Sequence, residues 1–317
     1  MTCPITSIPN PLNPQELYLF FLAGKGKYTP GLEIHSYASG SHAVTGFVDH
    51  GITAPAAGTN SILNLGAFTS VVWNSMLNVY AMVRDPEFVL AEGAESTATD
   101  PKRLAQISPF FNIIGDKQVA SVRGLGLASI VDGKGQAWMY AFTTPSLPSQ
   151  PYNIKAIKLK FVGSEAPSTL TPKYAPASNS QLAAVYHPEE DKTMVFYQDG
   201  KQGSIRMIVV NGDESELSNT KDSRAGTGIA VVSIKTASGT MLALYYFAEK
   251  GGNTQRIVRN EKGKWGKSSS LDDGENPVES AETSYLTASV MGDKVVLFYV
   301  AKDKDGFFVQ EDKIADF

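Results

Sequence analysis

LYLFFLA at residues 17–23 is the first of six copies of one phrase, an apolar run with an aromatic residue at its centre. The other copies are LNVYAMV (77–83), AWMYAFT (137–143), MVFYQDG (194–200), LALYYFA (242–248) and VVLFYVA (295–301). Their central aromatics are Phe20, Tyr80, Tyr140, Phe196, Tyr245 and Phe298, which lie 49 to 60 residues apart. A repeat of this length built from short strands is typical of a β-propeller, in which each repeat forms one sheet, or blade.

We therefore predict an all-β chain, a six-bladed β-propeller with blades of about four antiparallel strands. Residues 1–317 form one domain, with blades at about 1–57, 58–114, 115–175, 176–225, 226–279 and 280–317. The phrase is the second strand of each blade. In most repeats a strand with small residues precedes it, such as SILNLGAF from Ser61 or SQLAAVYH from Ser180, and small side chains let inner strands approach the axis.

The two ends of the chain are less regular than the middle. The first repeat has no clear inner strand, and the last has no clear fourth strand. We expect an N-terminal segment to complete the last blade, which would remove an unpaired sheet edge. Long insertions from Gly51, Glu92 and Thr144 are expected on one face, as a binding face or as variable loops.

Composition excludes several classes of partner. The formal net charge of −4 gives no electrostatic case for nucleic acid or an anionic membrane. Cys3 is the single cysteine, so no internal disulfide is expected. The N-terminus has neither the basic nor the apolar region of a secretory signal, and no apolar run approaches the roughly 20 residues that span a bilayer. We expect a cytoplasmic protein, with the oligomeric state open and a homodimer as one option.

The stretch QLAAVYHPEEDKTMVFYQDGKQGSIRMIVV at residues 181–210 resembles a blade of the fungal fucose-specific lectins, and GKWGK around Trp265 resembles the turn that ends one. The resemblance implies a six-bladed propeller with sugar sites between blades. It also implies an Arg two residues before each central aromatic, a Glu or Gln on the third strand, and an aromatic that stacks on the sugar.

This chain departs from that pattern at every Arg position. The six positions hold Tyr18, Asn78, Trp138, Met194, Ala243 and Val296. Third-strand Glu is expected only at Glu92 and Glu311, whereas other repeats have residues such as Ala156 and Met207. A sugar site without its charged donor loses the charge-assisted hydrogen bonds that orient the ligand. We expect the scaffold to be kept and the fucose chemistry to be lost.

No motif of a nucleophilic, metal or nucleotide-dependent enzyme occurs, so we expect no cofactor and no metal. The histidines, His35, His42, His50 and His187, are expected to be exposed or hydrogen-bonded rather than metal ligands. The acidic run from Glu189 to Asp191 is expected to be a solvated turn.

A lectin-like propeller without sugar sites also resembles the fungal hetero-Diels–Alderases of tropolone–sesquiterpenoid pathways. That resemblance implies hydrophobic substrates, a tropolone quinone methide and a humulene-type olefin, held in a near-attack pose. A hydrogen-bond donor on the tropolone oxygen would add electrostatic stabilisation. The alternatives are a lectin of altered specificity and a non-catalytic propeller that binds other proteins.

For the enzyme hypothesis we place the site at the mouth of the central channel and in the adjacent grooves. Trp73, Tyr80, Trp138 and Tyr18 are the candidate substrate-binding residues, and Arg123 and His35 are the candidate catalytic donors. The alternative is that the grooves have closed into ordinary core between blades.

Overall fold

The computed structural model describes residues 5–23, 31–38, 45–49, 67–85, 102–109, 111–114, 126–143, 152–161, 164–271, 278–302 and 307–316. The first blade contains β1 (Ile5–Asn10), β2 (Asn13–Ala23), β3 (Gly31–Ala38) and β4 (Thr45–Asp49). The second contains β5 (Phe68–Trp73), β6 (Met76–Arg84), β7 (Lys102–Ser108) and β8 (Asn112–Ile114). The third contains β9 (Leu127–Val131), β10 (Ala137–Phe142), β11 (Ile154–Lys158) and β12 (Ser168–Leu170).

The second half of the chain repeats this arrangement. The fourth blade contains β13 (Ala183–His187), β14 (Lys192–Gln198), β15 (Ile205–Val209) and β16 (Glu214–Leu217). The fifth contains β17 (Ile229–Lys235), β18 (Thr240–Phe247), β19 (Thr254–Arg259) and β20 (Ser269–Ser270). The sixth contains β21 (Leu286–Met291), β22 (Lys294–Val300) and β23 (Phe307–Lys313). Two short 3₁₀ turns, Ser218–Thr220 and Ile314–Asp316, are the only helical segments among the described residues, so none of these could span a membrane.

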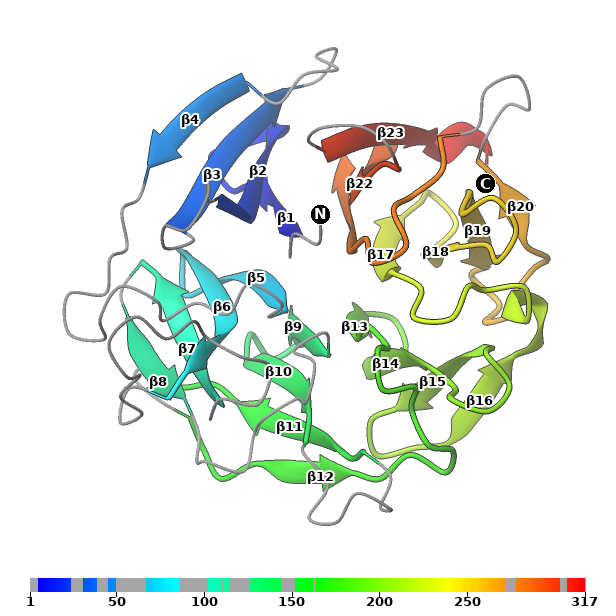
Figure 1. The fold of residues 1–317 in the computed structure, drawn as a ribbon, viewed down its shortest axis with the longest axis horizontal. Helices are drawn as coiled ribbons and strands as arrows, with labels where there is room; N and C mark the ends of the chain where they lie inside the picture. The colour runs from blue at the N-terminus through cyan, green and yellow to red at the C-terminus, as the bar shows by residue number, and fades with distance from the viewer. Residues whose placement is uncertain are drawn as a thin grey trace.

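Each blade is an antiparallel meander in which strands adjacent in sequence pair with each other. Figure 1 shows the six sheets arranged in a ring, with β1, β5, β9, β13 and β17 near its centre. The prediction of a six-bladed propeller is confirmed. The repeated aromatic phrase lies in the second strand of every blade, from β2 to β22.

Two expectations about the inner strands were wrong. The first blade does have an inner strand, because β1 pairs residue by residue with β2, from Ile5 opposite Phe21 to Pro9 opposite Leu17. The N-terminal segment therefore belongs to the first blade, and the last sheet has three strands in the described part of the chain. In the second repeat we expected the segment SILNLGAF, residues 61–68, to form the inner strand. The inner strand β5 instead begins at Phe68, the last residue of that segment. Most of that segment lies outside the described residues.

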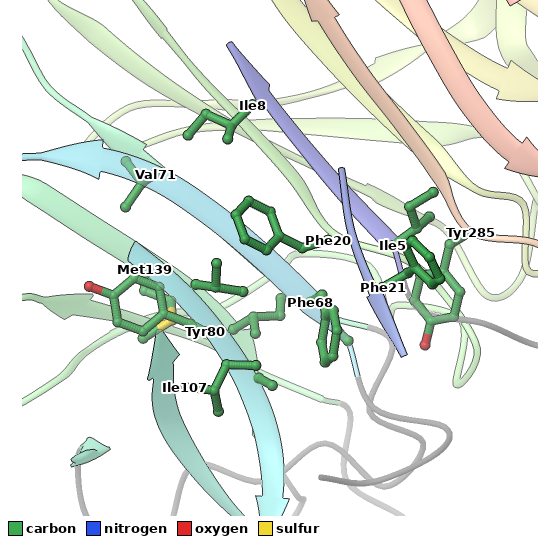
Figure 2. Packing of buried hydrophobic residues seen from close by; sticks show 14 of the residues in the cluster. Ile5, Ile8, Phe20, Phe21, Phe68, Val71, Tyr80, Ile107, Met139 and Tyr285 are labelled. Carbon is green, nitrogen blue, oxygen red and sulfur yellow. The ribbon is translucent and has the colours of Figure 1, made fainter. Parts of the chain in front are cut away.

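The central aromatics form the contacts between blades. All six are buried. Phe196 packs with Leu244 and Tyr246 of the fifth blade, and Tyr245 packs with Leu297 of the sixth, so this face of one blade meets the opposite face of the next. Figure 2 shows part of the largest cluster, with Tyr80 of the second blade next to Met139 of the third.

The inner strands share a four-residue segment that occupies the same place in every blade, opposite the central aromatic of the second strand. The residue paired with the central aromatic is the second of each four. The segments are ITSI (5–8), FTSV (68–71), LASI (127–130), LAAV (182–185), IAVV (229–232) and LTAS (286–289). The middle two residues are small in every segment except IAVV, and small side chains let six strands surround one axis.

The ring closes between the sixth and first blades through side chains. The hydroxyl of Ser7 lies 3.0 Å from that of Thr287 and 2.8 Å from that of Ser289. The Phe21 and Phe307 rings meet edge to face at 4.7 Å between centroids. No strand pairing crosses this seam among the described residues.

Candidate functional site: the central channel

The inner strands of all six blades enclose a channel of about 570 Å³ along the propeller axis. This volume falls in the range of roughly 300–1,000 Å³ that is usual for small-molecule sites. The described residues that line it are uncharged and include no catalytic acid, base or nucleophilic dyad. The channel therefore suits a neutral ligand.

The two ends of the channel differ. Where the inner strands begin, six apolar side chains form a buried layer: Ile5, Phe68, Leu127, Leu182, Ile229 and Leu286. Gln181 links two blades at this end, because its side-chain oxygen accepts from the Ile229 N–H at 3.1 Å and its side-chain nitrogen donates to the Leu286 carbonyl at 3.0 Å. Where the strands finish, Pro9 is exposed and Tyr186 and Val290 are half-buried. Among the described residues the lining is thus buried at the first end and more exposed at the second, which we call the accessible end.

One side of the channel carries a chain of hydroxyl groups, which we call the hydroxyl arc: Thr6, Ser7, Thr69, Ser70, Ser129, Thr287 and Ser289. The same contact recurs between neighbouring blades, from the second residue of one four-residue segment to the third residue of the next. It joins Thr287 to Ser7 at 3.0 Å, Thr6 to Ser70 at 2.9 Å and Thr69 to Ser129 at 2.7 Å. Each such hydrogen bond contributes about 0.5–1.5 kcal/mol to stability.

The other side is apolar. We call it the apolar arc: Ala183, Ala184, Val185, Ala230, Val231 and Val232. At the positions equivalent to the Thr and Ser of the hydroxyl arc, this side has Ala128 and Ala184 at one interface and Ala183 and Val231 at the next. The channel therefore has the hydroxyl arc toward β21, β1, β5 and β9, and is mainly hydrocarbon toward β13 and β17, where Tyr186 and Ser233 are the other hydroxyls of the lining.

The positions that the lectin resemblance assigns to Arg lie between blades, away from the channel lining. Met194, Ala243 and Val296 are buried in the clusters between blades. Asn78 is also buried, and its side chain donates to the Met76 carbonyl at 2.9 Å and accepts from Gln106 at 2.8 Å. At these four positions the grooves between blades are filled by buried side chains, as the hypothesis of closed grooves expects.

Trp138 and Trp73 lie at the accessible end of the third and second blades. The Trp138 indole N–H donates to the Asp132 carboxylate at 2.8 Å. Burial acts to raise the pKa of Asp132, but this bond and backbone N–H donors hold it below the ordinary value. The Trp73 indole N–H donates to the Gly135 carbonyl at 3.0 Å and so joins the hairpins of the two blades. Both indole N–H groups thus serve contacts within the protein.

The structure does not bring Tyr80 or Tyr18 to the channel lining. Tyr80 is buried in the largest core cluster, where burial raises its pKa, and Tyr18 packs against the same cluster. His35 lies on β3, its backbone opposite Leu19, and its side chain is outside what the structure describes. Arg123 also lies outside the described residues. The roles proposed for Arg123 and His35 therefore stay predictions.

Two acidic residues are engaged in contacts between blades. The Glu311 carboxylate accepts from Lys294 at 2.6 Å and from the Tyr37 hydroxyl of the first blade at 2.5 Å. Glu190, expected in a solvated turn, binds Arg259 of the fifth blade at 2.5 Å. Its backbone N–H donates to the ring of buried His187 at 3.3 Å. No group of three potential metal ligands occurs in the part of the chain that the structure describes.

The sequence contains a signal for the hydroxyl arc. ITSI at residues 5–8 and FTSV at 68–71 share a Thr-Ser pair one residue after the start of the inner strand. Thr is a common residue in strands, so its presence alone indicates little. The packing of neighbouring blades places the hydroxyls side by side.

Comparisons with known proteins agree with this architecture. Residues 167–312 match the family of fungal fucose-specific lectins, from β12 to β23. Among curated protein sequences none matches this chain. The AofleA protein of Arthrobotrys oligospora, as a triple arginine-to-alanine variant, has a similar structure with a TM-score of 0.65 and 12% identity, covering 98% of this chain and 83% of that chain.

Two further structures extend the comparison. A fungal lectin of Aleuria aurantia, described as a six-bladed β-propeller, has a TM-score of 0.56 and 12% identity, covering 99% of this chain and 96% of that chain. A sialidase of Trypanosoma rangeli has a TM-score of 0.56 and 8% identity, covering 97% of this chain and 54% of that chain. At these identities the similarity shows the fold.

Proposed function

Because this chain is a lectin-like six-bladed β-propeller whose residues 167–312 match the fungal fucose-specific lectins, we propose that it uses that scaffold to bind neutral small molecules in its central channel. The reaction we propose there is an intermolecular hetero-Diels–Alder coupling of a tropolone quinone methide with a humulene-type sesquiterpene. The observation that carries the proposal is the channel itself, which is uncharged, about 570 Å³ in volume, and divided into a hydroxyl and an apolar side.

The chemistry matches what this lining can offer. A hetero-Diels–Alder addition forms two σ bonds from π electrons of the reactants and keeps every atom, so the protein need supply neither a proton nor an electron pair. Its contribution is to hold both partners in contact and in the reacting geometry, which removes much of the entropic part of the barrier. Hydroxyl donors such as Ser70 can stabilise charge that grows on the tropolone oxygen.

The competing function is sugar binding, which the family match over residues 167–312 supports. Against it, four of the six positions assigned to Arg are filled by buried core residues. Microcalorimetric titration with methyl fucoside and a glycan array test this reading directly. Saturable glycan binding at micromolar concentration that is unaffected by filling the channel would support the lectin and contradict our proposal.

The proposal is tested by the reaction itself. Purified protein is mixed with α-humulene and a precursor that releases the tropolone quinone methide, and adducts are separated by chiral chromatography. We expect one stereoisomer to form at least tenfold faster than without protein. Ala184→Phe fills the channel from the apolar arc and should return the reaction to background.

Lys201→Phe adds the same side chain at an exposed position of the same blade and serves as the control. This variant should keep wild-type rates and selectivity. A wild-type reaction at the background rate with mixed stereochemistry would contradict catalysis. Equal activity in Ala184→Phe and Lys201→Phe would contradict the placement of the site in the channel.

A further inference from the structure

The repeated Thr–Ser contact stops halfway around the channel. It occurs at three consecutive blade interfaces, between Thr287 and Ser7, Thr6 and Ser70, and Thr69 and Ser129. At the other three interfaces the equivalent positions hold Ala128 and Ala184, Ala183 and Val231, and Ala230 and Ala288, none of which has a hydroxyl. A network that served only to hold the blades together would be useful at every interface, whereas this one covers a single side of the cavity.

The hydroxyl arc keeps hydrogen-bonding capacity toward the cavity. Its seven hydroxyls form four hydrogen bonds with one another, and Ser129 can donate to the Ser70 carbonyl at 3.2 Å. Because each hydroxyl has one donor, three O–H groups are not used in the four mutual bonds, and the rotatable Ser129 O–H can point either to the Ser70 carbonyl or to a ligand, as far as the hydrogen bonds of the described residues show. Ser70, Ser129 and Thr287 are half-buried, so they are the members that reach the open part of the channel.

The apolar arc has no such capacity. Its side chains are those of Ala and Val, and Ala184 and Val231 are half-buried at the channel surface. A polar edge of a ligand placed against this side would lose its hydrogen bonds to water without replacement, which is unfavourable. A hydrocarbon surface placed there would gain from burial.

We propose that the hydroxyl arc determines the orientation and the class of ligand. The ligand is a neutral molecule with an oxygen-bearing edge, such as a cyclic ketone, that faces Ser70, Ser129 and Thr287, and with a hydrocarbon face against Ala184 and Val231. This inference rests on the proposed channel site. In it, the hydroxyl arc determines which side of the channel binds the oxygen-bearing ligand and which side binds the hydrocarbon. In the coupling, the tropolone component lies toward β1, β5 and β9, and the olefin lies toward β13 and β17.

The test uses two probes that separate the two sides. Tropone is a neutral ring with one carbonyl oxygen, and α-humulene is a hydrocarbon. Binding of each is measured from the rise in melting temperature with probe concentration, which also reports whether each variant folds. In the double variant Ser70→Ala/Ser129→Ala we expect at least a tenfold loss of tropone affinity and less than a twofold change for α-humulene.

Ser233→Ala is the matched control, because Ser233 is a channel hydroxyl on β17 outside the hydroxyl arc. It should leave tropone affinity within twofold of wild type. Val231→Thr places a hydroxyl in the apolar arc and should weaken α-humulene at least fivefold while leaving tropone within twofold. The opposite pattern, or an equal loss of tropone in Ser233→Ala and the double variant, would overturn the inference.

Failure of the underlying proposal gives a different result. If neither probe binds the wild-type protein, the channel is not the site and the proposed function is wrong. If both bind but the variants do not separate them, only the orientation is wrong. A crystal structure of the wild-type protein with tropone gives an answer even if the double variant does not fold, because the carbonyl oxygen must lie within hydrogen-bond distance of Ser70, Ser129 or Thr287.

Discussion

At the scale of single residues, Glu190 shows how an exposed hairpin can tie two blades together. Its carboxylate binds Arg259 at 2.5 Å and Lys192 at 3.2 Å, and it lies 3.7 Å from the ring of His187. The hydrogen bond from Arg259 lowers the pKa of Glu190, against the opposing effect of burial. The ionised form is therefore stabilised in the folded protein.

The sign of the pH effect follows from this shift. Because the folded-state pKa is lower than that of the unfolded chain, about 4.3, the stabilisation is present above that pH and disappears as the pH falls through the folded value. We expect Glu190→Gln to lower the free energy of unfolding by about 1 kcal/mol at pH 7 and by much less at pH 3. Urea denaturation at both pH values measures this difference.

Glu189→Gln changes the neighbouring carboxylate, which is exposed and bonds to Thr240 at 3.1 Å. Its effect at pH 7 should be smaller than that of Glu190→Gln. A pH-independent loss in Glu190→Gln would show that the pair with Arg259 contributes through packing rather than charge.

At the scale of elements, the close approach of inner strands limits the size of residues at their starts. Gly228 immediately precedes β17, and a Cβ there would lie 2.7 Å from the Cβ of Leu286 and 2.8 Å from the Phe247 ring. Both neighbours are buried core residues, so neither can move away easily. We expect Gly228→Ala to destabilise the protein by about 1–3 kcal/mol, measured by chemical denaturation.

Gly266→Ala is the matched substitution, because Gly266 is exposed and the nearest atom to its Cβ would be the Val258 oxygen at 3.4 Å. It should change stability by less than about 0.5 kcal/mol. Equal effects in the two variants would mean that the loss at Gly228 arises in the unfolded chain rather than from crowding at the axis.

The second strands and the propeller itself were predictable because buried strands produce long apolar runs with a regular repeat, as in LALYYFA. The inner strand β1 was missed because ITSIPN is short, polar at Thr6 and Ser7, and contains Pro9. Its identity depends on pairing with β2, which no local pattern reveals. The channel lining was missed for the same reason: Ser70 and Ser129 become neighbours only through the register of separate blades.

At the scale of the whole molecule, the seam between the first and sixth blades differs from the others because no chain connection crosses it. Ser7→Ala removes the hydroxyl contacts with Thr287 and Ser289 at this seam. We expect amide hydrogen exchange in β1 and β21 to rise by at least tenfold, since local opening there need not strain any linker. Mass spectrometry of exchanged peptides measures the change.

Ser129→Ala removes the equivalent contact with Thr69 at the interface of the second and third blades, which the chain does cross. Exchange in β5 and β9 should rise less than exchange at the seam. A similar rise in both variants would show that chain continuity does not protect an interface.

Because β1 pairs within its own blade, the blades can form before the ring closes. Every blade is built from strands that are consecutive in the chain, so each can form from short-range contacts as soon as its residues are available. The contacts between the first and sixth blades differ, because they join residues far apart in the chain, such as Ser7 and Thr287, which are 280 positions apart. Folding in order of synthesis would thus produce an open crescent before a ring. The channel is complete only when those last contacts form, so ligand binding reports the end of assembly and a truncated chain would have blades without a site.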